Sequence, residues 1–264
     1  MLAHREQGPA GAVRGTLLCV HGYPESSYMW RHLLPAAAAA GWRAVAPDLA
    51  GYGDSPPDPP ATWTRHIEAL DAFHRALDLG PCVLVLHDWG GLIGLRWAHD
   101  RPEVARALVL ANTGFFPDGR WHGLADAMRT PGVGEDLVEN MTEEGFAGML
   151  RAVSPQFDAA AIAEYWKAFA TPEHRRGQLE LYRSGEFAEL EPYDLARFDV
   201  PALVLWGAQD IFAPVSGAHR FARELPQARL EVLEEAGHFV FDEAPEWSTA
   251  SVLRFLGELE LLVA

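Results

Sequence analysis

Three residues of the chain have the types and positions that a catalytic triad requires. Asp88 follows the apolar run 82–86 after a single histidine, Asp210 lies beyond the apolar run 202–206, and His238 precedes the last predicted helix. A nucleophile, a general base and an acid that orients the base are the parts that covalent hydrolysis needs. A lone Asp or His in a loop more often caps a helix or faces solvent. Three such residues, each near the end of a predicted strand, favour a triad.

Asp88 lies where a strand is predicted to turn sharply into a helix. Gly90 and Gly91 follow it closely, and glycines allow a helix and a strand to approach each other. Asp88 would then lie at the carboxyl end of the strand and face the backbone N–H groups of the new helix, where an anion is favoured. The alternative is that Asp88 only caps that helix.

Apolar runs alternate with helical patterns towards both ends of the chain. This alternation predicts an α/β fold with a mostly parallel central sheet flanked by helices. Residues 114–195 instead contain charged helical segments without strand signals, so we expect a helical cap inserted into a core of residues 1–113 and 196–264. The predicted strands are 16–20, 43–46, 82–86, 107–111, 202–206 and 230–233, and the predicted helices include 27–40, 63–77, 90–98 and 245–262.

Composition narrows the possible partners. The 264 residues suit one domain with an insertion, and 37 acidic against 21 basic residues give a formal charge of -16, which disfavours nucleic acid and anionic membranes. The chain has no apolar run of about 18 residues and no signal-like segment in residues 1–15, so we expect a cytoplasmic protein without a membrane span.

Cys19 and Cys82 lie in apolar runs and are expected to be packing residues, with no disulfide and no cysteine metal site.

With these motifs the chain resembles the α/β-hydrolase superfamily. The turn at Asp88 is similar to the nucleophile elbow of that superfamily, and the order of nucleophile, acid and histidine is the same. Because the nucleophile is Asp and not Ser, the resemblance is to the branch that holds haloalkane dehalogenases, epoxide hydrolases and haloacetate dehalogenases. It implies that Asp88 attacks an sp³ carbon to form an alkyl ester, that His238 activates the water that hydrolyses the ester, and that Asp210 orients His238. It implies no metal and no organic cofactor.

The segment His-Gly-Tyr-Pro at residues 21–24 resembles the oxyanion loop of the same superfamily. The resemblance implies that the backbone N–H groups of Tyr23 and Trp89 form the oxyanion hole. The alternative is an ordinary Gly-Pro turn.

Other positions bear on the choice between the members of this branch. Trp89 matches the residue whose indole N–H stabilises the leaving halide in haloalkane dehalogenases, although epoxide hydrolases also have Trp there. Leu86, two positions before Asp88, is a bulky aliphatic residue as in haloalkane dehalogenases, where epoxide hydrolases and haloacetate dehalogenases usually have Gly. A second halide donor would come from Trp121 or Trp166, although a Trp on a helix is more often a core residue. No arginine lies between Trp89 and Leu95, which argues against a haloacetate substrate.

Epoxide hydrolysis remains the alternative. Tyr182 matches the cap tyrosine that protonates the epoxide oxygen in epoxide hydrolases, although it could equally be a packing residue. The first tyrosine of that family's pair has no evident counterpart, and His122 could replace it. We therefore expect a haloalkane dehalogenase acting on a small apolar organic substrate and water, with epoxide hydrolase as the alternative.

Two further readings stay open. The protein could be a binding module on a hydrolase scaffold, but a complete set of triad residues argues against this. It could also catalyse different cofactor-independent chemistry, because a fold does not fix a function. The sequence leaves the oligomeric state undetermined.

Overall fold

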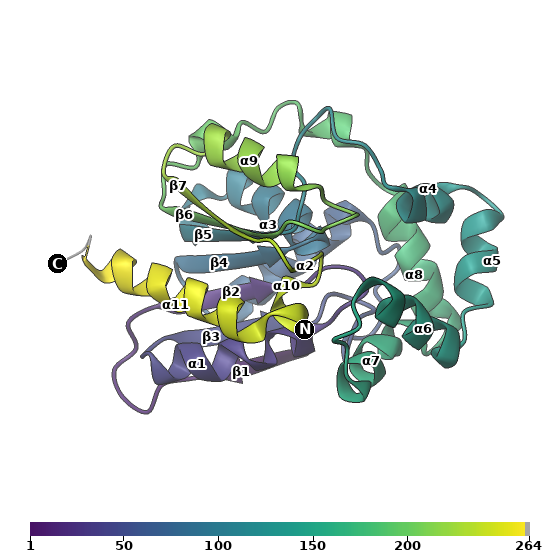
Figure 1. Ribbon diagram of the computed structural model, residues 1–264, viewed down its shortest axis with the longest axis horizontal. Coiled ribbons are helices and arrows are strands. Elements are labelled where there is room, and N and C mark those ends of the chain that lie inside the picture. The colour runs from purple at the N-terminus through teal and green to yellow at the C-terminus, as the bar shows by residue number, and fades with distance from the viewer. Residues whose placement is uncertain (262–264) are drawn as a thin grey trace.

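The computed structural model describes residues 1–261 and contains a seven-stranded sheet with helices on both faces (Figure 1). The strand order is β1-β3-β2-β4-β5-β6-β7, and every neighbouring pair is parallel except β1 and β3. The mostly parallel α/β sheet expected from the apolar runs is therefore confirmed. The strands are β1 (His4–Gln7), β2 (Thr16–Val20), β3 (Arg43–Pro47), β4 (Cys82–His87), β5 (Ala105–Ala111), β6 (Ala202–Gly207) and β7 (Ala228–Leu233).

The central strands carry the core. All residues of β2, β4 and β6 are buried, as expected of parallel strands covered on both faces, and Cys19 and Cys82 are among these buried residues. The edge strand β1 was not predicted. Three of its four residues are exposed and none is apolar, so it has no hydrophobic pattern that sequence analysis could detect.

The helices flank the sheet as two packed groups. Helices α1 and α11 contact each other on one face, and α2 and α3 contact each other on the other face (Figure 1). The bounds are α1 (Leu33–Ala39), α2 (Trp63–Ala76), α3 (Trp89–Asp100), α9 (Val215–Glu224), α10 (Val240–Glu243) and α11 (Pro245–Leu261). Helices α9 and α10 were not predicted, and residue 262 of the predicted last helix lies outside the described residues. Within those residues no helix is long and apolar enough to cross a membrane.

The helix predicted at 27–40 is divided. A short 3₁₀ helix covers Ser27–Arg31, and α1 begins at Leu33. Pro35 explains the break, because a proline ring collides with the carbonyl of the residue four positions earlier in a continuous α-helix.

We refer to residues 114–195 as the cap segment. They leave the sheet after β5, return before β6, and form helices gathered beyond one end of the sheet (Figure 1). Aromatic and aliphatic residues hold these helices together, for example Phe146 against Phe169, whose ring centroids are 5.0 Å apart. The helices are α4 (Gly123–Arg129), α5 (Val133–Glu139), α6 (Glu143–Val153), α7 (Ala159–Trp166) and α8 (Pro172–Arg183), with short 3₁₀ turns between and after them.

Candidate active site

Asp88 lies in the sharp turn between β4 and α3. Its backbone has φ 48° and ψ -121°, a region that costs a non-glycine residue on the order of 1–3 kcal/mol. The turn packs so tightly that a Cβ on Gly90 would lie 2.2 Å from the carbonyl oxygen of Val20, and one on Gly91 would lie 2.1 Å from Thr113 Oγ1. The two glycines therefore let α3 start directly against β2 and against Thr113, two residues beyond the end of β5.

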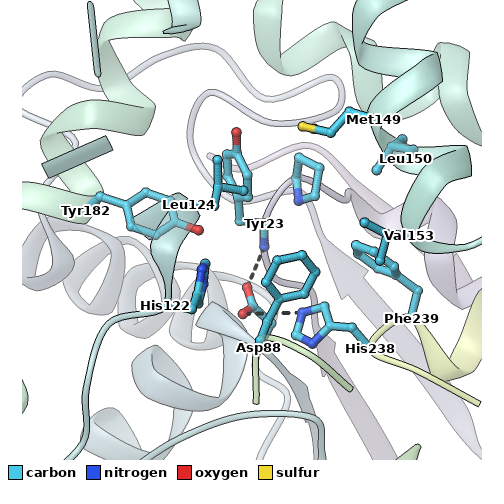
Figure 2. A pocket seen from close by; sticks show the side chains of 12 residues that line it. Tyr23, Asp88, His122, Leu124, Met149, Leu150, Val153, Tyr182, His238 and Phe239 are labelled. Carbon is cyan, nitrogen blue, oxygen red and sulfur yellow. Dashed lines mark hydrogen bonds and ion pairs between the residues drawn. The ribbon is translucent and has the colours of Figure 1, made fainter. Parts of the chain in front are cut away.

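The structure brings the three predicted triad residues together. His238 Nδ1 is 2.8 Å from Asp210 Oδ2, and His238 Nε2 is 3.6 Å from Asp88 Oδ2. Figure 2 shows the imidazole beside the Asp88 carboxylate. Because Asp210 occupies Nδ1, the free ring nitrogen Nε2 faces Asp88, which is the orientation that a general base needs.

The second oxygen of Asp88 is held by the loop that follows β2. The Tyr23 backbone N–H donates to Asp88 Oδ1 over 2.7 Å. A Cβ on Gly22 would lie 2.3 Å from Asp88, so the loop reaches this close only with glycine there. This contact is the geometry expected of an oxyanion donor. The other expected donor, Trp89, is the first residue of α3.

Charges in the site favour an ionised nucleophile. Burial opposes ionisation of Asp88, but hydrogen bonding and positive charge from His238, together with His87 and the Tyr23 N–H, outweigh it and lower the pKa to about 2. Burial likewise opposes protonation of His238, but the carboxylates of Asp210 and Asp88 outweigh it and raise the pKa well above 6.5. An ester on Asp88 would remove one of these two anions, so the imidazole would lose its proton more readily in such an intermediate.

Asn112 is a supporting residue that sequence analysis missed. Its Nδ2 donates to Asp210 Oδ2 over 2.7 Å, and Asp210 Oδ1 accepts from the N–H groups of Phe212 and Ala213 over 2.7 and 2.8 Å. These donors and His238 lower the pKa of Asp210 against the opposing effect of burial. Asn112 follows the apolar run of β5 just as Asp88 follows that of β4, so the same positional signal could have identified it.

A buried ion pair lies behind His238. His87 Nδ1 is 2.8 Å from Glu25 Oε2, both side chains are fully buried, and His87 Nε2 is 2.9 Å from the His238 carbonyl oxygen. Burial alone would lower the pKa of His87, but Glu25 outweighs it and raises the pKa. No sequence signal paired these residues, because Glu25 lies in the loop after β2 and His87 is the last residue of β4.

Two cavities meet at Asp88. The first, of about 410 Å³ including open solvent, is lined mainly by apolar side chains of the cap segment and of the core (Figure 2). The second, of about 880 Å³ including open solvent, extends past Trp89 and Trp121 towards the start of α9. Four residues line both cavities: Asp88, His122, Tyr182 and Phe212. A substrate carbon above Asp88 could therefore extend groups into both spaces.

Aromatic residues with donor groups line the cavities at Asp88. The rings of Trp89 and Trp121 are stacked with centroids 5.6 Å apart, and Tyr182 lies edge-on to Trp89 at 5.3 Å. The Trp121 Nε1 atom is buried without a hydrogen-bond partner in the described part of the chain. The Trp89 side chain is hydrogen-bonded to Tyr182. Because an indole can only donate, the Tyr182 oxygen accepts this bond and its own proton stays available to a ligand.

The remaining two predicted residues differ in position. His122 lines both cavities, and its Nδ1 accepts from the Ala125 N–H at the start of α4 over 3.3 Å. Trp166 lines neither cavity; it stacks on Phe169 at 5.2 Å, and Arg175 lies 5.5 Å above its ring. The structure therefore does not bring Trp166 to either cavity at Asp88, and its half-buried ring packs within the cap segment.

Comparisons with known proteins agree with this geometry. A family model described as the alpha/beta hydrolase fold matches residues 15–245. A haloalkane dehalogenase of Mesorhizobium japonicum is 33% identical over 96% of this chain and 87% of that protein. A cis-3-alkyl-4-alkyloxetan-2-one decarboxylase of Xanthomonas campestris is 27% identical over 97% and 92%, and epoxide hydrolase 3 of Siraitia grosvenorii is 28% identical over 92% of each protein. The crystal structure of a putative ancestral haloalkane dehalogenase superposes with a TM-score of 0.83 at 29% identity, covering 98% of this chain and 96% of that one.

Proposed function

The chain belongs to the α/β-hydrolase fold family, and from this premise we propose that it cleaves the carbon–halogen bond of a small haloalkane through an ester on Asp88. Membership of this family, with haloalkane dehalogenase and epoxide hydrolase relatives, makes the protein an enzyme of hydrolase type. The substrate and the covalent route are the proposal.

In the first step an oxygen of Asp88 forms a bond to the substrate carbon. The carbon–halogen bond breaks and its electron pair leaves with the halide. The low pKa of Asp88 supplies the carboxylate without a base. As negative charge develops on the halogen, the indole N–H of Trp121, which has no partner in the described residues, is suited to donate to it, and the indole N–H of Trp89 can join it by leaving the Tyr182 oxygen. Such donors lower a barrier most effectively in a dry site.

In the second step water attacks Cγ of the Asp88 ester and His238 Nε2 accepts a proton from it. The tetrahedral oxyanion is stabilised by the Tyr23 N–H, which already donates to Asp88 Oδ1. The bond between Cγ and the alcohol oxygen then breaks, and the alcohol leaves with the proton from His238. Asp88 is left as a carboxylic acid with one oxygen from water, and its low pKa releases the second water proton to solvent and restores the carboxylate. Asp210 holds the imidazole throughout.

The observation that carries this proposal is the buried N–H of Trp121, which has no partner among the described residues and lies in a side chain that lines the same cavity as Asp88. A buried donor without an acceptor costs about 1–3 kcal/mol. Trp121 and Trp89 both line the cavity that contains the nucleophile. A halide ion is an acceptor of suitable size and charge for such a site.

Epoxide hydrolysis is the second candidate, and the phenol of Tyr182 supports it. Tyr182 lines both cavities and keeps its proton available, because its oxygen accepts from Trp89. Tyr23 adds a second phenol to the first cavity, with its ring centroid 5.2 Å from that of Tyr182. Either phenol could protonate the oxygen of an opening epoxide.

A matched substrate panel tests the proposal. We would incubate the protein with 1-bromobutane, 1,2-epoxybutane and a cis-3,4-dialkyl oxetan-2-one, and measure bromide, diol and alkene. The proposal expects bromide release that Asp88→Asn abolishes. Diol without bromide would favour epoxide hydrolysis over dehalogenation. Alkene from the lactone, without bromide or diol, would favour decarboxylation over both. No product from any of the three substrates would contradict all three functions.

A further inference from the structure

A carboxylate outside the triad holds the loop that carries His238. Glu243, the last residue of α10, accepts from the Gly237 N–H through Oε2 over 2.6 Å and from the Phe239 N–H through Oε1 over 3.1 Å. The two donors flank His238 directly. Glu243 forms no ion pair within residues 1–261, so these backbone groups are what its side chain binds.

The carbonyl groups of the same loop are held from the opposite direction. Asn112 Nδ2 donates to the Gly237 carbonyl oxygen over 3.2 Å, and His87 Nε2 lies 2.9 Å from the His238 carbonyl oxygen. The backbone on each side of the histidine is therefore fixed, and the ring itself is fixed by Asp210. Such support determines whether Nε2 stays within reach of an attacking water.

Asp242, the neighbouring carboxylate, cannot replace Glu243 in this role. Asp242 Oδ1 accepts from Arg31 over 2.6 Å, and Asp242 Oδ2 accepts from the Tyr165 hydroxyl over 2.8 Å. Both of its oxygens are thus engaged between the core and α7. Among the residues that the structure describes, only Glu243 has both carboxylate oxygens on the loop of His238.

We propose that Glu243 is a positioning residue that keeps His238 in place for hydrolysis of the covalent ester. The inference rests on the proposed two-step function. Attack by Asp88 on an electrophilic carbon requires no base, whereas hydrolysis of the ester requires His238 at the correct distance from water. Loss of the two hydrogen bonds between Glu243 and the backbone beside His238 therefore slows hydrolysis of the ester and leaves the attack by Asp88 unchanged.

The expected size follows from the geometry. An amide in place of the carboxylate keeps one acceptor oxygen and presents an NH₂ group to the other backbone N–H, so one of the two contacts is lost. A displacement of about 1 Å in a catalytic group can cost 10²-fold. For a partial displacement we expect Glu243→Gln to hydrolyse the ester about 10-fold more slowly or worse.

The kinetic test compares Glu243→Gln with Glu246→Gln. Glu246 lies in the exposed first turn of α11, three residues further along, and its side chain makes no hydrogen bond in the described chain. With 1-bromobutane in a rapid-quench experiment, Glu243→Gln should release bromide in the first turnover at the wild-type rate and then accumulate the Asp88 ester. Glu246→Gln should match the wild type. Equal slowing of both steps, or hydrolysis within about twofold of wild type, overturns the inference.

A second readout separates this inference from the proposed function. In NMR spectra of protein labelled with ¹⁵N-histidine and free of substrate, the ring resonances that disappear in His238→Gln are those of His238. Glu243→Gln should shift or broaden them, and Glu246→Gln should not. If the His238 resonances are unchanged in Glu243→Gln, the positioning role is overturned, whether or not the wild type turns over any substrate. If the wild type releases neither bromide nor diol, that result contradicts only the proposed function. If Glu243→Gln does not fold, Glu243→Asp, which keeps the charge but shortens the reach, should give the same pattern.

Discussion

Replacing Trp121 by phenylalanine tests the halide site with little change elsewhere. The substitution keeps an aromatic ring against Trp89 and beneath Arg129, whose guanidinium lies 4.9 Å from the Trp121 ring centroid. It removes the buried Nε1–H that has no partner in the described residues. Loss of one donor to a developing negative charge typically costs about 2.7–4 kcal/mol, or 10²–10³-fold in rate. We expect the carbon–halogen cleavage step to slow by that factor.

The same substitution should have a small effect on stability. The smaller ring buries less apolar surface against Trp89 and Phe187, but removal of an unpartnered buried N–H recovers about 1–3 kcal/mol. The two terms oppose each other, so we expect the free energy of unfolding to change by less than about 2 kcal/mol. A large loss of rate with a small change in stability distinguishes a functional donor from a packing residue.

Trp166→Phe provides the matched control, because Trp166 is a stacked cap tryptophan that lines neither cavity. The assay is stopped-flow or quenched-flow measurement of first-turnover halide release from 1-chlorobutane and 1-bromobutane, alongside thermal unfolding of each variant. The halide-site reasoning is refuted if Trp121→Phe retains a cleavage rate within about threefold of wild type, or if Trp166→Phe loses as much.

Three further results are expected. Tyr182→Phe should reduce turnover of 1,2-epoxybutane by about 10²-fold, the range for a lost general acid, and leave bromide release unaffected; unchanged diol formation excludes the acid role. Because the pKa of Asp88 is about 2, the rate of first-turnover bromide release should be independent of pH from about pH 4 upwards. The rate of ester hydrolysis should fall as the pH falls, because this step needs neutral His238 and Asp210 raises the pKa of that histidine. A cleavage step that falls together with hydrolysis between pH 7 and pH 5 would contradict this assignment. Asp210→Asn should slow hydrolysis by about 10²-fold or more through loss of the correct tautomer, and mass spectrometry should detect the accumulated ester.

Much of the core follows from local sequence patterns. The apolar runs at β2, β4, β5 and β6 are continuous because those strands are covered on both faces. Residues that come after such runs collect at the carboxyl edge of the sheet, which made Asp88 and Asp210 predictable. Strand β1 lacked any such signal, because its exposed polar residues are held by pairing with β3.

The supporting residues of the site depend on contacts between distant segments. Glu25, in the loop after β2, pairs with His87 at the end of β4, and Asn112 reaches Asp210 from the end of β5. Glu243 is close to His238 in sequence, but its acceptors are matched to backbone N–H groups, which carry no residue-specific signal. Side-chain direction in the cap segment is likewise set by tertiary packing, so sequence alone could not separate Trp121, which lines a cavity, from Trp166, which is half-buried against Phe169 and Arg175.

The measurement that tests the account most directly is mass spectrometry of His238→Gln after incubation with 1-bromobutane or 1,2-epoxybutane. Without its base the enzyme should react once and stop, so that a butyl or hydroxybutyl group is found on the peptide containing Asp88, and Asp88→Asn should acquire no such group. One equivalent of product released by His238→Gln without an adduct, or an adduct on Ser26, Ser27 or Ser55, would contradict the ester mechanism and with it both candidate functions.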